Sequence, residues 1–314
     1  MILSIIICTR DRADSLVETL RSISQVAAPD HCGLELLVVD NGSTDHTRSV
    51  VESAVFKNGV IRYVFEPKPG LSVARNRGVK EARGEIIVFT DDDVRVPPNW
   101  LVDLTYPIRS GRADAVAGGV LFPEHVRCEL RAWPLDDRWS WFASTADLNA
   151  ERPERMVGAN MAFHRRVLRE VPCFDECLGA GALGFYEDTL FAQQLVNAGY
   201  ALVGALNVTV EHHFDTSRLS NRSLKALATR MGRSRAYMFH HWRHQKSRLA
   251  LVRWCSTAVK AVWRAVGTSF GGEPNRVTGR DLDFEVRRAF LTEYLSIKRQ
   301  PPRYRRHQLQ APGR

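Results

Sequence analysis

Short apolar runs alternate with segments of helical periodicity through the first two hundred residues. This alternation is typical of βαβ units, in which helices flank a largely parallel sheet. The pattern therefore predicts an α/β fold. The predicted strands are 3–8, 34–40, 61–65, 86–90, 115–120 and 157–163, and the predicted helices lie near 15–26, 45–55, 72–82 and 98–110.

The pattern is less regular in the second part of this region. Residues 121–156 are rich in Trp, Pro and charge and show no clean period, which favours a long functional loop. Its tryptophans offer flat apolar rings that could stack on a ligand or equally pack in a core; they include Trp133, Trp139 and Trp141.

A further helix is predicted from about Tyr186 to Gly199. Its helical spacing places Leu190, Leu195 and Val196 on the inward face.

The charge of the chain is divided unevenly along its length. Residues 1–217 contain 22 Lys and Arg against 30 Asp and Glu, whereas residues 218–314 contain 22 against 5. We therefore expect two parts with different roles, the first of which is a domain at 1–216. A basic helical region then follows at 217–314.

The basic region predicts a negatively charged partner surface. Within residues 249–266, Arg253, Lys260 and Arg264 share one helical sector, an arrangement that suits a helix lying in an anionic membrane interface. Packing on the domain at 1–216 is the alternative. Three charges in eighteen residues exclude a membrane span, and the absence of a recognisable nucleic-acid module makes nucleic acid the less favoured partner.

Cysteine usage and the first residues predict the compartment. The six cysteines show no C-x-x-C pair and no regular spacing, so we expect reduced packing residues. The apolar run at 2–8 leads directly into Thr9 and Arg10 without a basic leader. The sequence predicts a cytoplasmic protein, with peripheral attachment to the inner face of the membrane as an added expectation.

Three consecutive carboxylates, Asp91, Asp92 and Asp93, follow the apolar run 86–89 directly. Ligands of open α/β sheets bind at the carboxyl edge of the strands, where these side chains are expected. Adjacent like charges repel, and a divalent cation relieves that repulsion. Oxygen ligands suit Mg²⁺ or Mn²⁺, which also take ligands from substrate phosphates. A solvated acidic turn is the alternative.

Two further segments have the character of ligand sites. Asp40 ends the apolar run 36–39 and precedes a glycine turn, so it could face a ribose or base edge or belong to ordinary turn chemistry. Gly70–Gly78 opens a helix that contains Arg75 and Arg77. A guanidinium near a helix N-terminus suits a diphosphate, and a solvated basic face is the alternative.

The last candidate site residues are an acidic pair and a histidine pair. Glu187 and Asp188 follow a glycine-rich stretch at the predicted start of a helix, where carboxylates often act only as caps or dipole partners. His212 and His213 follow the apolar run 208–210, and a neutral imidazole can bind ions of the Mn²⁺ class.

These pieces, in this order, resemble the family 2 glycosyltransferases over roughly residues 2–215. The resemblance implies an inverting enzyme with the GT-A fold, a Rossmann-like α/β sheet flanked by helices. It also implies that residues 1–216 are the catalytic domain, with a nucleotide-sugar half at about 1–120 and an acceptor half at about 121–216. The matching motifs are residues 4–11, 38–45, 70–78, 89–93, 158–163, 186–188 and 210–212.

The resemblance also implies roles for individual residues. Asp188 corresponds to the general base, and Glu187 accompanies it in the same catalytic motif. Asp91, Asp93 and His212 correspond to the metal ligands, although His213 is adjacent and the sequence leaves open which of the two histidines reaches the metal. The donor contacts are expected from Thr9, Arg10, Asp11, Asp40, Arg75, Asp91 and Asp92, and residues 158–163 correspond to the strand lining the acceptor side.

The implied reaction transfers a sugar from a nucleotide-sugar, most simply a UDP-sugar, to a hydroxyl of a glycan or lipid-linked acceptor. Mn²⁺ or Mg²⁺ is the implied cofactor. One departure is that Cys8 and Arg10 stand where many members carry Pro and an aromatic residue that stacks on the base; Arg can stack as well.

Three other classes compete with this interpretation. A haloacid-dehalogenase-like phosphatase would place its Asp pair on the first strand and a Thr or Val where Arg95 stands. A nucleotidyltransferase of similar fold would carry a glycine-rich first loop, which residues 9–12 lack. Retention of Asp91, Asp93 and Asp188 argues against an inactive sugar-nucleotide-binding protein.

Overall fold

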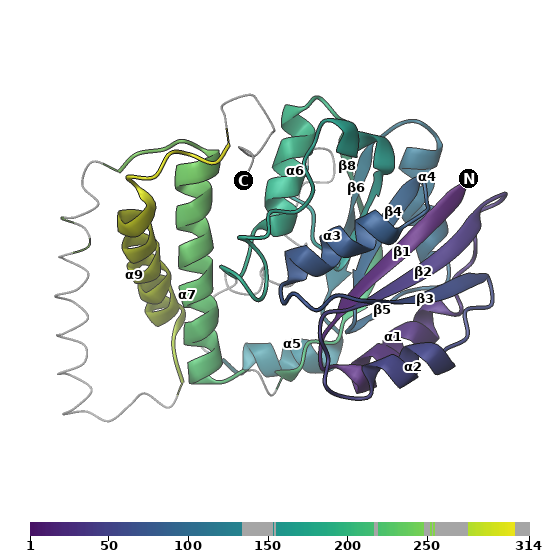
Figure 1. Cartoon of the computed structure of the whole chain (residues 1–314). Coiled ribbons are helices and arrows are strands. Elements are labelled where there is room, and N and C mark those ends of the chain that lie inside the picture. The colour runs from purple at the N-terminus through teal and green to yellow at the C-terminus, as the bar shows by residue number, and fades with distance from the viewer. Residues whose placement is uncertain are drawn as a thin grey trace. The chain divides into compact units, whose positions relative to one another are not determined.

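The computed structural model describes residues 1–133, 153, 155–216, 219–247, 252, 254 and 276–304 (Figure 1). The chain forms two compact units. The first comprises Met1–Glu124, Trp141–Ala182 and Glu187–Phe214, and the second comprises His125–Ser140, Leu183–Tyr186 and Asp215–Arg314. The functional division into 1–216 and 217–314 stays a prediction.

The first unit is built on an eight-stranded sheet of order β3-β2-β1-β4-β7-β6-β8-β5. Strands β3, β2, β1 and β4 run parallel, whereas β7 is antiparallel to both β4 and β6. The α/β fold predicted from the sequence is confirmed. In chain order the strands are β1 (Ile2–Thr9), β2 (Gly33–Asp40), β3 (Gly59–Phe65), β4 (Ile86–Asp91), β5 (Val94–Arg95), β6 (Ala115–Leu121), β7 (Asn160–His164) and β8 (Leu202–His212).

Helices cover both faces of this sheet (Figure 1). Alternate residues of β1 point to opposite faces. Leu3, Ile5 and Ile7 share one buried cluster with side chains of the helices α1, α2 and α4. Helix α3 covers the opposite face, where a Cβ on Gly78 would lie 2.6 Å from Cγ2 of Ile6. The helices of this unit are α1 (Ala13–Ile23), α2 (Thr47–Ser53), α3 (Leu71–Glu81), α4 (Trp100–Arg109), η2 (Arg165–Arg169) and α6 (Glu187–Asn197).

Burial on both faces explains why the central strands were recognisable. Parallel strands that are covered on both sides consist of nearly continuous apolar residues. Every residue of β2 after Gly33 is buried, and so is most of β1.

The structure differs from the sequence prediction at three places. Residues 121–156 contain a helix, α5 (Glu124–Arg131), which buries Val126. The strand predicted at 157–163 begins only at Asn160. Val196 is 53% exposed rather than inward, because the buried face of α6 is formed by Leu190, Phe191 and Leu195.

Several predicted features fall outside the described residues. They include Trp139, Trp141 and all of 249–266 except Val252 and Trp254. Trp133 is described, and the guanidinium of Arg276 lies 5.0 Å from its ring centre.

The second unit is helical in its described part. Helix α7 (Asn221–Tyr237) continues into a π-helical turn, Met238–Trp242, and packs along α9 (Gly279–Ile297). The two helices approach closely at Gly232, where a Cβ would lie 2.8 Å from the Cβ of Ala289. None of the described helices combines the length and apolar character needed to cross a membrane.

Candidate active site

The predicted site begins where β1, β2 and β4 end. Thr9 pairs with Asp40 across β1 and β2, and Cys8 pairs with Asp91 across β1 and β4. Because these strands are parallel and in register, the loops that follow them emerge at one edge of the sheet. Ligands of α/β sheets bind at this edge.

The loops after β1 and β2 are tied to each other. Asp11 is in the left-handed region, with φ of 52°. Its backbone N–H donates to Oγ of Ser43 at 2.9 Å, and its carboxylate accepts from the backbone N–H of Thr44 at 2.7 Å. This second bond helps hold the pKa of Asp11 below its usual value. Arg10 is exposed, and its Nε lies 3.6 Å from Oδ2 of Asp11.

Asp40 is buried beneath these loops rather than open to a ligand. Its carboxylate accepts from the backbone N–H of Ser43 at 2.8 Å and from the hydroxyl of Tyr63 at 2.7 Å. Burial, together with the bond to Asp40, raises the pKa of Tyr63 to about 12. In the described chain, Asp40 therefore fixes the turn that precedes α2.

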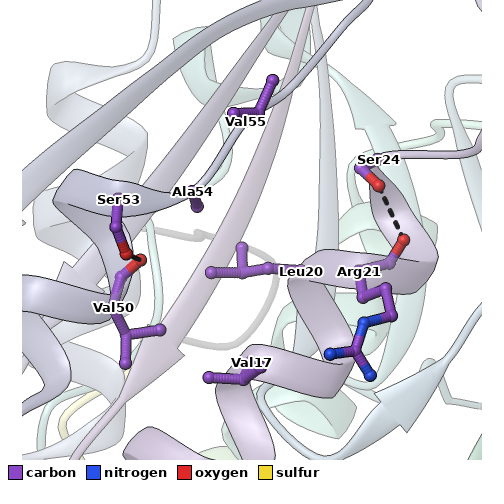
Figure 2. Close-up of a pocket in the computed structure, with 8 residues that line it drawn as sticks. All are labelled: Val17, Leu20, Arg21, Ser24, Val50, Ser53, Ala54 and Val55. Atoms are coloured by element: carbon purple, nitrogen blue, oxygen red, sulfur yellow. Dashed lines mark hydrogen bonds between the residues drawn. The ribbon is translucent and has the colours of Figure 1, made fainter.

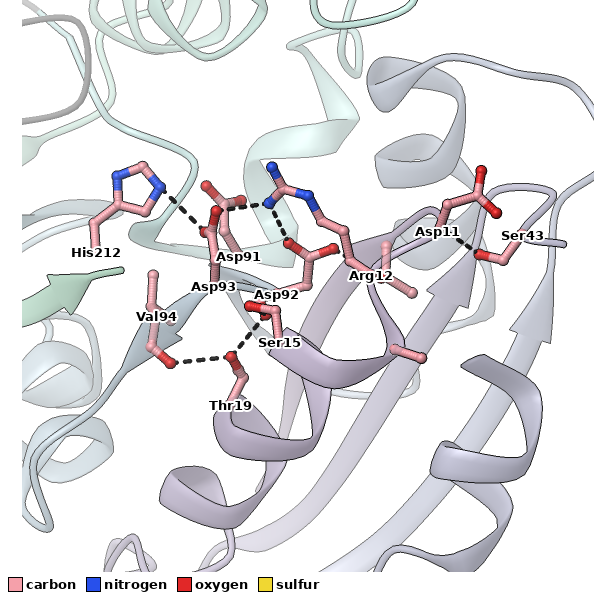
Figure 3. A network of polar contacts seen from close by, with 12 residues as sticks. Asp11, Arg12, Ser15, Thr19, Ser43, Asp91, Asp92, Asp93, Val94 and His212 are labelled. Carbon is pink, nitrogen blue, oxygen red and sulfur yellow. Dashed lines mark hydrogen bonds and ion pairs between the residues drawn. The ribbon is translucent and has the colours of Figure 1, made fainter. Parts of the chain in front are cut away.

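Arg12 joins two of the three consecutive carboxylates (Figure 3). Its Nη1 lies 2.9 Å from Oδ1 of Asp92 and 2.6 Å from Oδ2 of Asp93. Thr9 donates to the other oxygen of Asp92 at 2.7 Å. Burial raises the pKa of Asp92 to about 6, even though Arg12 opposes that shift. Repulsion among the carboxylates is thus relieved in part by an arginine, which the sequence argument for a cation did not consider.

His212 faces the remaining oxygen of Asp93. Its Nε2 lies 3.1 Å from Oδ1 of Asp93 (Figure 3). Although burial alone would raise the pKa of Asp93, His212 and Arg12 together lower it. His213 instead pairs with Glu211 at 3.4 Å. The structure therefore brings His212, and not His213, to the carboxylates.

The donor atoms of Asp93 and His212 fit a divalent cation. Oδ1 of Asp93 and Nε2 of His212 face each other at 3.1 Å, and the buried Nδ1 of His212 makes no hydrogen bond in the described part of the chain. A carboxylate oxygen and an imidazole nitrogen are both ligands for Mn²⁺. Among the described residues, however, no three His, Cys, Asp or Glu side chains are gathered closely enough to form a complete site. Asp93 and His212 would supply two ligands to such an ion, and further ligands would come from substrate or water.

Asp91 is directed to a different partner, Arg75. Nη2 of Arg75 lies 3.8 Å from Oδ1 of Asp91. Nη1 of Arg75 donates to Oε1 of Glu187 at 2.7 Å. Arg75 is only 3% exposed and lies near the rings of Phe89 and Phe174. The predicted donor-binding arginine is therefore a buried link between the strand end at Asp91 and the start of α6.

Glu187 is buried, whereas its neighbour Asp188 is partly exposed. Burial raises the pKa of Glu187 to about 7, Asp188 raises it further, and Arg75 opposes the shift. Asp188 accepts from the backbone N–H of Gly158 at 3.1 Å and from that of Thr189 at 2.6 Å. Of the two predicted catalytic carboxylates, Asp188 is the one accessible to a substrate.

Asn160, in the segment expected to line the acceptor side, is fully buried. Its amide donates to the carbonyls of Gly119 and Val208 at 2.8 Å each and accepts from Nε1 of Trp100 at 2.8 Å. The side chain joins β6, β7, α4 and the bulge in β8 and does not face a substrate.

Arg12 and Tyr63 shape the site but were not predicted from the sequence, and Gly158 was expected only as part of the acceptor-side segment 158–163. The signal for Arg12 was available, since a basic residue in the first loop lies at the same sheet edge as the three carboxylates. No local pattern identified Tyr63 or the contact of Gly158 with Asp188, because the partners are 23 and 30 residues away in sequence.

A pocket of about 350 Å³ lies between α1 and α2 (Figure 2). Val17, Leu20, Val50 and Val55 form most of its apolar lining, and Arg21 is its charged side chain. None of the predicted site residues lines it, so this pocket is separate from the candidate active site.

Comparison with known sequences identifies the family. The profile of glycosyl transferase family 2 matches residues 4–171, which is more than half of the chain. The chain belongs to this family. The match covers β1 to β7 and includes every predicted site residue except Glu187, Asp188 and His212.

Curated relatives share only part of their length with this chain. The succinoglycan biosynthesis protein ExoM of Rhizobium meliloti is 35% identical over 115 residues, which are 36% of this chain and 37% of that protein. The glycosyltransferase AglE of Haloferax volcanii is 30% identical over 209 residues, 65% of this chain and 64% of that protein. The chain therefore matches between about a third and two thirds of these relatives.

Solved structures confirm the fold class. The mannosyltransferase PcManGT from Pyrobaculum calidifontis, solved with GDP-Man and Mn²⁺, superposes with a TM-score of 0.58 at 20% identity. The superposition covers 94% of this chain and 86% of that one. The family 2 chain described above has the GT-A fold.

Proposed function

We propose that this chain is a glycosyltransferase of glycan or polysaccharide synthesis that transfers a sugar from a nucleotide-sugar to an acceptor hydroxyl with inversion. The observation that supports this most directly is the pairing of Asp93 with His212 after the end of β4, together with an accessible carboxylate at Asp188. Asp93 and His212 face each other through Oδ1 and Nε2, while the partly exposed Asp188 opens the helix beside the buried pair of Arg75 and Glu187.

Asp93 and His212 would hold the metal, with Asp91 near enough to affect the charge of both. A bound Mg²⁺ or Mn²⁺ supplies Lewis-acid stabilisation of the negative charge on a departing nucleoside diphosphate. PcManGT was solved with Mn²⁺ and a nucleotide-sugar, which supports the same pairing of ligands here.

The loops after β1 and β2 are the proposed binding site for the nucleotide. The bonds of Asp11 to Ser43 and Thr44 hold the loop after β1 against the loop after β2, and Asp40 fixes the turn from below. Arg10 is exposed at this edge, where its planar guanidinium can stack on a base. A UDP-sugar is the donor expected from the sequence.

Asp188 is the proposed general base. Its Oδ2 accepts a single backbone hydrogen bond from Gly158, so lone pairs remain for the acceptor hydroxyl. Asp188 would take the proton from that hydroxyl as the oxygen attacks the anomeric carbon, and direct displacement inverts the centre. Glu187 keeps Arg75 in place and does not itself contact substrate.

The test is Asp188→Asn, which keeps the side-chain shape and removes the basic oxygen. We expect kcat to fall by roughly 10²- to 10⁴-fold, the usual contribution of a positioned base. Donor binding should persist, measured as the thermal stabilisation by UDP- or GDP-sugars with Mn²⁺, since a ligand stabilises by RT ln(1 + [L]/Kd).

Asp103→Asn is the matched control, because Asp103 occupies the first turn of α4 as Asp188 does that of α6. Its turnover should equal that of the unaltered protein. Unchanged turnover in Asp188→Asn would remove Asp188 from the proposed role.

A further inference from the structure

Arg12 brings a positive charge into the proposed metal site. Its Nη1 lies 2.6 Å from Oδ2 of Asp93, while Oδ1 of Asp93 faces Nε2 of His212 at 3.1 Å (Figure 3). The side chain of Asp93 is only 7% exposed, so salt and solvent screen these contacts little. Both oxygens of Asp93 are therefore engaged, and one of them faces a side chain that is always charged.

The facing atoms of Asp93 and His212 have the spacing of adjacent ligands on one ion. Ligand atoms about 2.0–2.1 Å from an octahedral Mg²⁺ are about 2.9 Å apart when they are adjacent. Oδ1 of Asp93 lies 3.1 Å from Nε2 of His212. An ion held by Oδ1 would face the guanidinium that is held by Oδ2 of the same carboxylate. Like charges repel at such short range, so Arg12 and the ion compete for Asp93.

Asp92 keeps Arg12 at the site. Oδ1 of Asp92 lies 2.9 Å from Nη1 of Arg12, and Oδ2 accepts from the hydroxyl of Thr9 at 2.7 Å. The backbone carbonyl of Asp92 accepts from the hydroxyls of Ser15 and Thr19 on α1, the helix that begins directly after Arg12. Asp92 is thus bound to the chain segment that carries Arg12, and the guanidinium can turn about Asp92 without leaving the sheet edge.

The other nitrogens of Arg12 suit a phosphate group. Both ion pairs use Nη1, and among the described residues neither Nε nor Nη2 makes a hydrogen bond. The side chain is 32% exposed and belongs to the loop after β1, which is part of the proposed nucleotide site. A guanidinium binds phosphate oxygens through two parallel N–H groups. A nucleoside diphosphate at this edge therefore offers Arg12 a two-point contact, whereas Asp93 receives only a single nitrogen.

We propose that Arg12 is a resident cation of the metal site, which occupies Asp93 until a nucleoside diphosphate binds the guanidinium, and which thereby couples donor binding to metal binding. This inference rests on the proposed function, in which Asp93 and His212 hold the metal. Without the donor, the charge of Arg12 opposes the ion at Asp93. With the donor, Arg12 neutralises phosphate charge and leaves Asp93 to the ion. Because coupling between two ligands is reciprocal, the ion strengthens the binding of the diphosphate by the same factor.

Arg12→Gln tests the competition, because it removes the charge and keeps a polar side chain. We expect the variant to bind Mn²⁺ alone roughly 10-fold more tightly than the unaltered protein, a coupling of ordinary size. The EPR signal of free Mn²⁺ measures binding without turnover, at physiological ionic strength so that remote charges are screened. An arginine that only holds Asp93 in place gives the opposite result, since its loss weakens Mn²⁺ binding. An unchanged or weaker affinity in Arg12→Gln would therefore overturn the proposal.

Arg21→Gln is the matched control. Arg21 is an exposed residue of α1 that pairs with Glu18, and its substitution changes the net charge by the same amount as Arg12→Gln. Its affinity for Mn²⁺ should equal that of the unaltered protein. The Tm of each variant without metal shows whether the fold is retained.

A second measurement uses the unaltered protein, so it does not depend on the folding of a variant. Phenylglyoxal modifies arginine side chains, and mass spectrometry with fragmentation gives the rate at Arg12 separately from that at Arg10. Saturating Mn²⁺ should raise the rate at Arg12 severalfold, because the guanidinium leaves Asp93. UDP or GDP added together with Mn²⁺ should lower the rate again, because the diphosphate covers the guanidinium. A rate at Arg12 that Mn²⁺ leaves unchanged or lowers would contradict the competition.

The Mn²⁺ titrations also separate this inference from the proposed function. If Mn²⁺ binds to the unaltered protein and to Arg12→Gln with equal affinity, the inference about Arg12 is refuted, and the metal role of Asp93 and His212 stands. If Mn²⁺ binds to neither protein, or if Asp93→Asn leaves the affinity unchanged, the proposed metal role is refuted and the inference is refuted with it.

Discussion

Gly158→Ala offers a sharp test of the buried centre of this site. Gly158 is buried, and a Cβ there would overlap Nη2 of Arg75 and lie 2.6 Å from its Cζ. Carbon atoms in contact are normally about 3.5–4.0 Å apart, so the guanidinium would have to retreat by roughly 1 Å. It has little room, because Arg75 is 3% exposed and is bounded by Glu187 and Phe174.

The expected loss in the free energy of unfolding depends on whether the ion pair of Arg75 and Glu187 survives the substitution. Overpacking costs about 1–3 kcal/mol if the pair of Arg75 and Glu187 survives. Breaking that pair leaves a buried charge without its partner and costs about 3–5 kcal/mol. We therefore expect a loss near 3 kcal/mol, which lowers the Tm of a domain of this size by roughly 6–12 °C.

Thermal unfolding followed by circular dichroism measures this loss. Gly33→Ala is the matched control, since a Cβ there meets only Cγ1 of Ile2 at an ordinary 3.8 Å. The control should unfold within about 1 °C of the unaltered protein. A decrease in Tm of less than about 2 °C for Gly158→Ala would show that Arg75 is not confined as described.

Two further predictions concern charge. Burial raises the pKa of Asp92 from 3.8 to about 6. Between these pH values the folded state therefore binds more protons than the unfolded state. The free energy of unfolding should fall by about 3 kcal/mol as pH rises from 4 to 6 and stay lower above pH 6. Asp92→Asn should remove this slope in urea unfolding at pH 4 to 7, and an identical slope in both proteins would contradict the assigned pKa. Through its basic region, the protein should sediment with anionic but not zwitterionic vesicles at low salt. Arg222 and Lys225 are exposed on α7, so the double substitution Arg222→Glu and Lys225→Glu should weaken that binding. Absence of binding to anionic vesicles at low salt would exclude the membrane partner.

The local pattern of apolar residues was sufficient to predict the central strands of the first unit. Central strands such as β1, β2 and β4 are buried on both faces, so continuous apolar runs marked them to within one residue at either end. Elements at the periphery were harder to recognise. Val196 has the same apolar character as Leu195 but faces solvent, because the orientation of α6 is set by its contacts and not by its own composition.

The sequence by itself determined which carboxylates end which strands, and hence that Asp40 and Asp91–Asp93 meet at one edge of the sheet. Only the tertiary structure decided what each of them does there. Arg12 lies 80 residues from Asp92, and Arg75 lies 112 residues from Glu187. Ion pairs between such distant residues form only when the chain has folded, whereas strand ends are fixed by the local pattern of burial. That difference explains why the edge could be predicted while the burial of Glu187, the pairing of Arg75 and the accessibility of Asp188 could not.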